Sequence, residues 1–444
     1  MSHSHHTKIK DLEEKILKDF RKHESLSDVI LLHPKLKVLF ITFLICLLIL
    51  SSLEAFGIIK GIFSGDFKHD TKNKTVDGKL LSPEEYAHYA YLFSGRAVSP
   101  GYEKVQKFIN KQQTSYSKDT TNTQNKKNKI QFVGMAFDGS YSHKMWDKTL
   151  NFSEEMKESG TPAYFTYFIN ASYFLEGTST LSYTPPRGTP GTSAIGFGES
   201  KEDVHIRAHD VKRAVDQGHE IGSHSVGHFD GSDWSEDEWA YELNTFKSIM
   251  KDVLKKEVGP AFGDSFNTTG FRAPNLGVNK NLYEVLKKLG YSYDASGIES
   301  PSVWPYKDKN GLWRLPLPSI YLDSDKSEPP VNTWQGKKAV LAMDYSIYVV
   351  QTNSTNMLHK ETEAWKAAYD SLLRAYMEYF DKSYNGDRAP VYVANHFSAW
   401  NDSLYWEVQK TFAKKVCGMP DVYCGTHRDL INYIKQTEKE LQKQ

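Results

Sequence analysis

Apolar runs and helical patterns alternate along the chain from about residue 130 to its end. The run IQFVGMAF at residues 130–137 is almost continuously apolar, as expected for a strand that is covered on both faces. A helical pattern over residues 145–156 follows and stops at Gly160. The next apolar run, AYFTYFI at residues 163–169, predicts a second strand. The segment therefore begins as strand, helix, strand.

The same alternation continues towards the C-terminal end. Ser200 and Ser235 are suited to cap two further helices, because a serine oxygen accepts hydrogen bonds from N–H groups in a helix's first turn. Helices are also predicted near residues 279–289 and 361–380 and twice at the end of the chain, and strands at 291–296, 340–345 and 391–397. Units of this kind over about 310 residues predict a parallel α/β barrel, closed or deformed.

A longer apolar segment precedes this region. Residues 36–59 (LKVLFITFLICLLILSSLEAFGII) are long enough to cross a hydrocarbon layer of about 30 Å, and they predict one transmembrane helix. A cleaved signal peptide fits less well, because a long polar stretch comes first. Lys and Arg residues are frequent in residues 1–35 and at the start of the span. This charge bias favours a cytoplasmic N-terminal tail and places the domain at residues 130–444 on the other side of the membrane, in the periplasm or outside the cell. Residues 60–129 end in a polar run and predict a connector.

Composition narrows the class of partner and the compartment. Lys plus Arg and Asp plus Glu are balanced at 55 each, so there is no global electrostatic case for nucleic acid. Aromatic residues make up 13% of the chain, which suits a large buried core or a sugar-stacking cleft. Cys417 and Cys424 are close enough in sequence to pair in an oxidising compartment, whereas Cys46 lies in the predicted span.

Polar, titratable residues repeatedly stand where the predicted strands stop. In a parallel barrel the C-terminal strand ends share one face, so these residues are expected to converge; they are Asp138, His224, His228, Arg272, Asp344 and His396. Histidines four residues apart can point neutral nitrogens at one metal ion, although such pairs are often ordinary surface or hydrogen-bonded residues. The Gly-, Pro-, Ser- and Thr-rich loop at residues 178–198 is longer than a simple connector, which favours a functional role.

Four short motifs in this order resemble those of the polysaccharide deacetylase (NodB-homology, carbohydrate esterase 4) family. AFDGS at residues 136–140 resembles its T-F-D-D-G, and HSVGH at 224–228 resembles its H-[ST]-x-x-H. FRAPNLG at 271–277 resembles its R-x-P segment, and the strand end at Asn395 and His396 resembles its L-x-H. The longer segment GHEIGSHSVGH at residues 218–228 is the most specific of these resemblances. The predicted membrane span and connector lie outside the resemblance.

The resemblance implies a deformed (β/α) barrel that acts as a metal-dependent amide hydrolase on N-acetylated sugars. It implies that His224 and His228 bind a divalent ion, usually zinc, that Asp138 is the general base and that His396 is the general acid. Arg272 would keep Asp138 charged and oriented. Asp344 is a weaker candidate for steering His396 or Arg272, and an ordinary strand-end carboxylate is its alternative reading.

One departure from the family bears on the metal. The family's first motif has two adjacent aspartates, a base and a metal ligand, whereas here Asp138 is followed by Gly139. Three outcomes follow: the two histidines hold the ion with water and with help from Ser140, Asp138 is itself a ligand and another group is the base, or the site has lost catalysis. We favour an active enzyme with Asp138 as base, because the rest of the acid-base set is present.

The expected substrate is a cell-envelope glycan, with the N-acetylglucosamine of peptidoglycan first and another surface polysaccharide or a lipid-linked sugar as alternatives. The competing hypothesis is a membrane-tethered glycan-binding protein with a degraded metal site. In either case four aromatic residues could stack on sugar faces, though each alone is more often a core residue; they are Trp234, Tyr293, Trp313 and Trp400.

Overall fold

The computed structural model describes residues 75–76, 79–80, 130–299, 303–323, 333–334 and 337–441. The chain divides into two compact units, Met1–Leu81 and Ser82–Gln444. In the first, β1 (Thr75–Val76) pairs antiparallel with β2 (Lys79–Leu80). The predicted membrane span at residues 36–59, the tail before it and most of the connector lie outside the described residues. Within the described part of the chain, no helix has both the length and the apolar character needed to cross a membrane.

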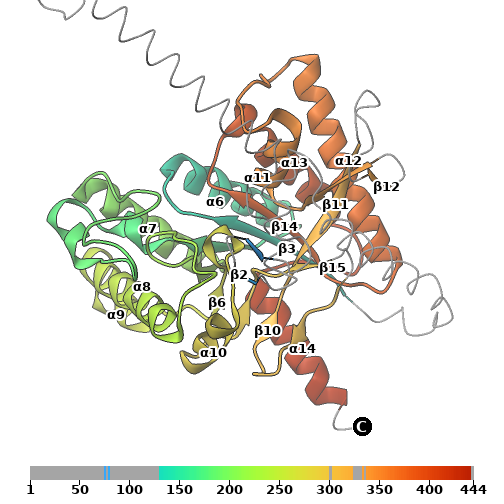
Figure 1. Ribbon diagram of the computed structural model, residues 1–444. Helices are drawn as coiled ribbons and strands as arrows, with labels where there is room; N and C mark the ends of the chain where they lie inside the picture. Colours follow the sequence, from blue (N-terminus) through green and yellow to red (C-terminus); the bar gives the residue numbers. More distant parts are fainter. Residues whose placement is uncertain are drawn as a thin grey trace, which may run out of the picture. The chain divides into compact units, whose positions relative to one another are not determined.

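A curled parallel sheet forms the centre of the second unit (Figure 1). Its parallel strands follow the order β14-β3-β4-β5-β6-β7, and β15 also pairs with β3. Beyond β7 come β10, which is parallel to it, and β9, which is antiparallel to β10. The strands are β3 (Gln131–Asp138), β4 (Phe165–Ile169), β5 (Glu220–Ser223), β6 (Gly270–Phe271), β7 (Tyr293–Asp294), β9 (Tyr306–Lys307), β10 (Trp313–Arg314), β14 (Val391–His396) and β15 (Val422–Cys424).

A smaller sheet joins the two sides of the curled sheet. It has the order β12-β13-β11-β8 and consists of β8 (Ile298–Glu299), β11 (Leu317–Asp323), β12 (Thr333–Trp334) and β13 (Lys337–Leu341). The backbone N–H of Ala394 in β14 donates to Ala342 (2.9 Å), that of Ala342 to Pro318 (2.9 Å), and that of Leu317 to Gly297 (2.7 Å). This sheet departs from the all-parallel expectation, because β11 and β13 pair antiparallel.

Helices connect the strands at nearly the places that the sequence predicts. They are α6 (His143–Glu158), α7 (Lys201–Asp216), α8 (Glu236–Glu257), α9 (Pro260–Ser265), α10 (Lys280–Lys288), α11 (Asp344–Thr352), α12 (Glu363–Asn385), α13 (Trp400–Val416) and α14 (His427–Leu441), with 3-10 turns η2 (Ala171–Phe174), η3 (Gly177–Ser182) and η4 (Pro274–Leu276). Ser200 caps α7, and Ser235 with Glu238 forms a capping box at α8. The strand predicted over residues 340–345 was wrong in its second half, because Asp344 begins α11.

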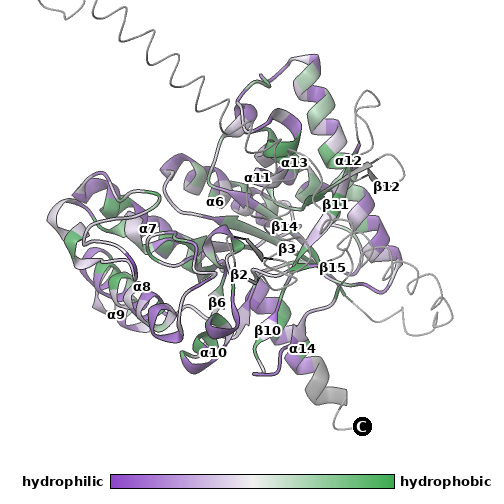
Figure 2. Ribbon diagram, in the orientation of Figure 1, coloured by the Kyte–Doolittle hydropathy of each residue, from purple (hydrophilic) through white to green (hydrophobic). Residues whose placement is uncertain are grey.

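Strand β3 is buried on both faces, as its continuous apolar run predicts. Val133, Met135 and Phe137 pack in the largest core cluster, whereas the alternating Phe132 and Ala136 belong to another. Figure 2 shows hydrophobic residues concentrated along the central strands and mixed hydropathy along the helices around them. Burial on both faces fixes the backbone of β3, and its last residue, Asp138, borders the turn that leads to α6.

The predicted disulfide between Cys417 and Cys424 is present. Cys417 caps the end of α13 and Cys424 ends β15, which pairs with β3. The bond therefore ties a peripheral helix to the central sheet.

Candidate functional site

The predicted site residues gather at the C-terminal ends of neighbouring strands. Asp138 ends β3 and His396 ends β14, and the two residues are direct partners in the register of this strand pair. His224 follows β5, and Arg272 follows β6, the next strand. The expectation that the strand-end residues lie together is therefore met for these four positions.

Asp138 and Arg272 form a buried ion pair. Arg272 Nη1 lies 2.7 Å from Asp138 Oδ1, and both side chains are almost fully buried. Arg272 Nε donates to the carbonyl of Ala295 (3.0 Å), and its guanidinium lies over the ring of Phe168. Burial raises the pKa of Asp138, but the positive charge of Arg272 outweighs burial and brings the pKa below its ordinary value. Asp138 is thus a carboxylate at neutral pH.

His224 and His228 lie close to each other, with ring centroids 4.9 Å apart. His224 Nδ1 donates to the carbonyl of Arg272 (2.8 Å), which leaves Nε2 without a proton in the neutral ring. Burial lowers the pKa of His224, and it lowers that of His228 to about 3. Both rings are therefore neutral at physiological pH, the state in which imidazole binds metals.

A buried glutamate that the sequence reasoning missed supports the turn between the two histidines. Glu242 in α8 accepts hydrogen bonds from the backbone N–H groups of Val226 (2.8 Å) and Gly227 (3.3 Å). It also accepts one from the hydroxyl of Tyr183 (3.0 Å), which lies in the long loop. Ser193 Oγ in the same loop donates to the Gly227 carbonyl (3.3 Å), so this loop contacts the histidine turn. The sequence did offer one signal for this role: Glu242 interrupts the apolar face of α8, and a buried carboxylate needs hydrogen-bond partners.

Asp344 holds His396. The imidazole Nδ1 of His396 lies 2.6 Å from Asp344 Oδ1, and the backbone N–H of His396 donates to Oδ2 (2.8 Å). Burial lowers the pKa of His396, but the charge and hydrogen bond of Asp344 outweigh it and raise the pKa above its ordinary value of 6.5. The ring therefore carries a proton more readily than a free histidine. The sequence left two interpretations of Asp344: a residue that steers His396 or Arg272, or an ordinary strand-end carboxylate. In the structure, Asp344 contacts His396 directly.

The donor set for a metal contains two imidazoles. Gly139, where the family has its second aspartate, has no side chain and adopts a φ of +86°, and a Cβ placed there would meet no heavy atom within 4 Å. Across the described segments, no group of three or more His, Cys, Asp or Glu side chains is arranged to hold a metal ion. Ser140 Oγ is buried without a hydrogen-bond partner. The two histidines fit a divalent ion in donor type, and a protein carboxylate to complete the set is lacking.

One of the four aromatic candidates borders this site. The rings of Trp400 and Tyr345 lie 5.6 Å and 6.1 Å from that of His396. Tyr345 is 41% exposed, and Trp400 is partly buried. The core reading holds for the other three candidates, because Trp234, Tyr293 and Trp313 are buried. Trp400, with Tyr345 beside it, is therefore the one of the four aromatic candidates that lies next to the site.

Comparison with known proteins gives one family match. Residues 125–293 match the sequence model of the family described as polysaccharide deacetylase. No curated protein matches the chain. The matched range contains the motifs at Asp138, His224, His228 and Arg272, whereas His396 and Asp344 lie beyond it.

The solved structures that match the chain are distant from it in sequence. A protein from Mycobacterium smegmatis named as a polysaccharide deacetylase has 14% identity and a TM-score of 0.44, with 70% of this chain and 92% of that chain covered. The peptidoglycan deacetylase PdaC from Bacillus subtilis has 14% identity and a TM-score of 0.35, with 71% and 97% covered. A carbohydrate esterase family 4 pseudoenzyme from Bacillus anthracis has 11% identity and a TM-score of 0.34, with 68% and 66% covered.

Likeness at this level assigns no function to the chain. The family match does bear out the resemblance of the sequence motifs, because residues 125–293 match the model of the polysaccharide deacetylase family.

Proposed function

We propose that the protein is a membrane-anchored, metal-dependent deacetylase that hydrolyses the N-acetyl group of an envelope glycan. The observation that carries the proposal is the assembly at neighbouring strand ends of a charged base, Asp138 with Arg272, and a proton donor, His396 with Asp344. Amide hydrolysis needs both functions, because water must lose a proton to attack and the departing amine must gain one.

The side chains suit these roles in their protonation states. Asp138, kept ionised by Arg272, removes a proton from the attacking water. The water oxygen bonds to the acetyl carbon, the C–N bond breaks, and protonated His396 supplies a proton to the departing nitrogen. The products are acetate and a free amino sugar. Asp344 orients the ring of His396 and favours its protonated form.

His224 and His228 would hold a divalent ion, zinc by the family resemblance, with water completing its coordination. Such an ion acidifies a bound water and polarises the acetyl carbonyl. The hydrogen bond from His224 Nδ1 to Arg272 fixes the tautomer that leaves Nε2 free for this purpose. Ser140 Oγ is a candidate to orient water in the absence of a carboxylate at residue 139.

The anchor and the substrate rest on the sequence. The apolar residues 36–59 support a single span with the N-terminus in the cytoplasm and the catalytic domain, residues 130–444, outside. An outward-facing deacetylase meets cell-envelope glycans, so peptidoglycan N-acetylglucosamine is the first substrate to test. Insertion is tested by protease protection of vesicles that carry the full-length chain, with tags at both ends.

The test of the reaction is acetate release by the full-length chain in detergent from N-acetylglucosamine oligomers and from purified wall glycan, with added zinc. Asp138→Asn removes the base and should reduce release to a small residual rate. Asp381→Asn, an exposed carboxylate of α12, is the matched control and should leave release unchanged. Absence of acetate from every glycan at saturating zinc would refute the hydrolase.

The incomplete donor set favours one alternative, a membrane-tethered glycan-binding protein without turnover. Gly139 supplies no carboxylate next to Asp138, and two neutral imidazoles hold an ion less tightly than a set that includes an anion. This alternative predicts saturable glycan binding that zinc does not affect, together with no acetate. Isothermal titration with chitin oligomers, with and without chelator, separates the two functions.

A further inference from the structure

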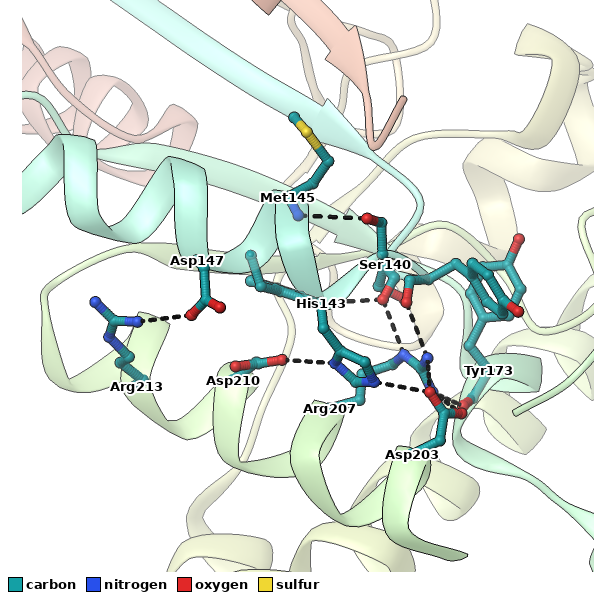
Figure 3. A network of polar contacts seen from close by, with 12 residues as sticks. Ser140, His143, Met145, Asp147, Tyr173, Asp203, Arg207, Asp210 and Arg213 are labelled. Atoms are coloured by element: carbon teal, nitrogen blue, oxygen red, sulfur yellow. Dashed lines mark hydrogen bonds and ion pairs between the residues drawn. The ribbon is translucent and has the colours of Figure 1, made fainter. Parts of the chain in front are cut away.

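A second polar network contacts the turn that follows Asp138, and it is centred on Arg207 of α7 (Figure 3). Arg207 is fully buried and uses every N–H of its guanidinium. Nε donates to the carbonyl of Ser140 (2.9 Å), Nη1 to that of Tyr173 (2.6 Å) and Nη2 to that of Tyr141 (2.9 Å). The remaining two donors bind both oxygens of Asp203, at 2.9 Å and 2.7 Å.

Asp203 links this arginine to the start of α6. His143 Nε2 lies 2.7 Å from Asp203 Oδ1, and its Nδ1 lies 3.1 Å from Asp210 Oδ2, one helical turn further along α7. Burial raises the pKa of Asp203, but the hydrogen bonds from Arg207 and from the Glu199 N–H outweigh burial and lower it. The carboxylate is therefore charged and pairs with Arg207 at neutral pH.

The segment that Arg207 holds is the irregular turn between β3 and α6. One residue, Gly139, separates Asp138, the last residue of β3, from Ser140, whose carbonyl Arg207 binds. Other contacts of the turn are the hydrogen bond from Gly139 N–H to the Phe168 carbonyl (2.9 Å), that from Trp146 Nε1 to the Ser140 carbonyl (3.1 Å), and that from the Tyr141 hydroxyl to Glu199. Through Tyr173 the same guanidinium reaches the 3-10 turn that follows β4, the strand between Asp138 and the histidine turn.

A glycine with a φ of +86° leaves the turn with a flexible link directly after the base. A planar five-donor fork that binds three carbonyl oxygens at once fixes their relative positions, which the single ammonium of a lysine cannot do. We propose that Arg207 and Asp203 are positioning residues for the deacetylase reaction, which hold the turn after Asp138 and thereby fix the base. This inference rests on the proposed function and assigns neither residue a contact with substrate.

The test compares Arg207→Lys with Arg213→Lys in the full-length chain. Arg213 lies on the same helix, but its partners Asp147, Asn151 and Glu154 are exposed. Figure 3 shows its contact with Asp147. We expect Arg207→Lys to lower kcat by about tenfold or more and to leave KM nearly unchanged, because a misplaced catalytic group costs rate rather than binding. Arg213→Lys should change neither. In an Asp138→Asn background, Arg207→Lys should have little further effect on the residual rate, because both changes act through one group.

A second measurement does not depend on activity. Amide hydrogen exchange should speed up at residues 139–142 in Arg207→Lys and stay unchanged at residues 224–228. Asp203→Asn, which retains the three carbonyl contacts, serves if Arg207→Lys does not fold, and should give a smaller change in the same direction. Faster exchange with unchanged kcat would overturn the positioning role, and so would unchanged exchange. If the wild-type chain releases no acetate, the proposed function fails, and exchange at residues 139–142 alone decides whether Arg207 holds the turn.

Discussion

Gly139→Asp tests whether the site lacks one carboxylate ligand. The substitution places a second carboxylate beside Asp138, as in the first motif of the family that the sequence resembles. The structure offers room for it, since a Cβ at this position has no heavy atom within 4 Å. The backbone hydrogen bond from residue 139 N–H to Phe168 does not involve a side chain and is retained.

The cost of the substitution lies in the backbone. A φ of +86° is in the left-handed region, where a side chain costs about 1–2 kcal/mol, and Asp lies towards the lower end because its short polar side chain tolerates this region. We therefore expect the free energy of unfolding to fall by about 1 kcal/mol. In a domain of this size, such a loss lowers the melting temperature by at most about 4 °C.

The gain should appear in metal affinity. Loss of an outer partner of a metal ligand typically weakens binding by about 10–100-fold, so a direct anionic ligand should strengthen it by about tenfold or more. Zinc affinity is measured by competition with a chromophoric chelator, and acetate release is measured at limiting zinc. Gly139→Asn has nearly the same shape and backbone cost without the charge, and it is the matched control.

The comparison of the two variants decides the matter. If Gly139→Asp binds zinc no more tightly than Gly139→Asn, the missing ligand does not belong at residue 139. If affinity rises and acetate release at limiting zinc does not, the native two-histidine site already holds its ion well enough for turnover, or the chain is not a hydrolase. Acetate release at saturating zinc separates these two cases.

Three further predictions follow from the contacts of the site. Asp344→Asn removes the charge that raises the pKa of His396, so the alkaline limb of the pH profile of kcat should move to lower pH. The stability that this pair contributes is present below the unfolded pKa of about 6.5, and it is lost as pH rises through the folded pKa of His396. An unmoved limb would exclude His396 as the acid. Arg272→Met leaves Asp138 buried without its partner and should cost about 3–5 kcal/mol of unfolding free energy in denaturant at pH 7. The cost should shrink as pH falls below the unfolded pKa of about 3.9 and through the lower folded pKa of Asp138, where the ion pair is lost. An equal loss at pH 7 and pH 3 would contradict the ion-pair origin. Thiol titration of the denatured chain should find one thiol before reduction and three after it, and reduction should cost about 2–3 kcal/mol, as expected for so short a loop; three thiols before reduction would contradict the bond.

The sequence predicted those parts of the fold that depend on local patterns. Ser200 and Ser235 marked helix starts correctly, because a cap acts within one turn of its own helix. Convergence of Asp138, His224, Arg272 and His396 followed from the geometry of parallel strands rather than from any single motif. The run LAMDYSIYVV was divided wrongly, because a short apolar run does not distinguish a strand from a buried helix, and α11 begins inside it.

The supporting polar contacts could not be predicted in the same way. Arg207 binds carbonyls that lie 67, 66 and 34 residues away in the sequence, and Glu242 binds amides 16 and 15 residues away on another element. No local pattern encodes such partners. Buried charges of this kind require several hydrogen bonds to offset the loss of hydration, so their partners become apparent only when the elements have been placed in space.

The ion pair limits what Asp138 can do. Arg272 binds Oδ1, and the described residues place no hydrogen bond on Oδ2. One free oxygen can accept a proton from water or bind an ion, and it cannot do both at once. If Asp138 were the ligand that replaces the missing carboxylate, Asp138→Asn would weaken zinc binding together with turnover; if it is the base, turnover alone is lost. A rigid arginine fork on each side of the turn, Arg272 on the carboxylate and Arg207 on the carbonyls, suits a base that must stay at a fixed distance from water. The zinc affinity of Asp138→Asn therefore separates the two roles that the sequence left open.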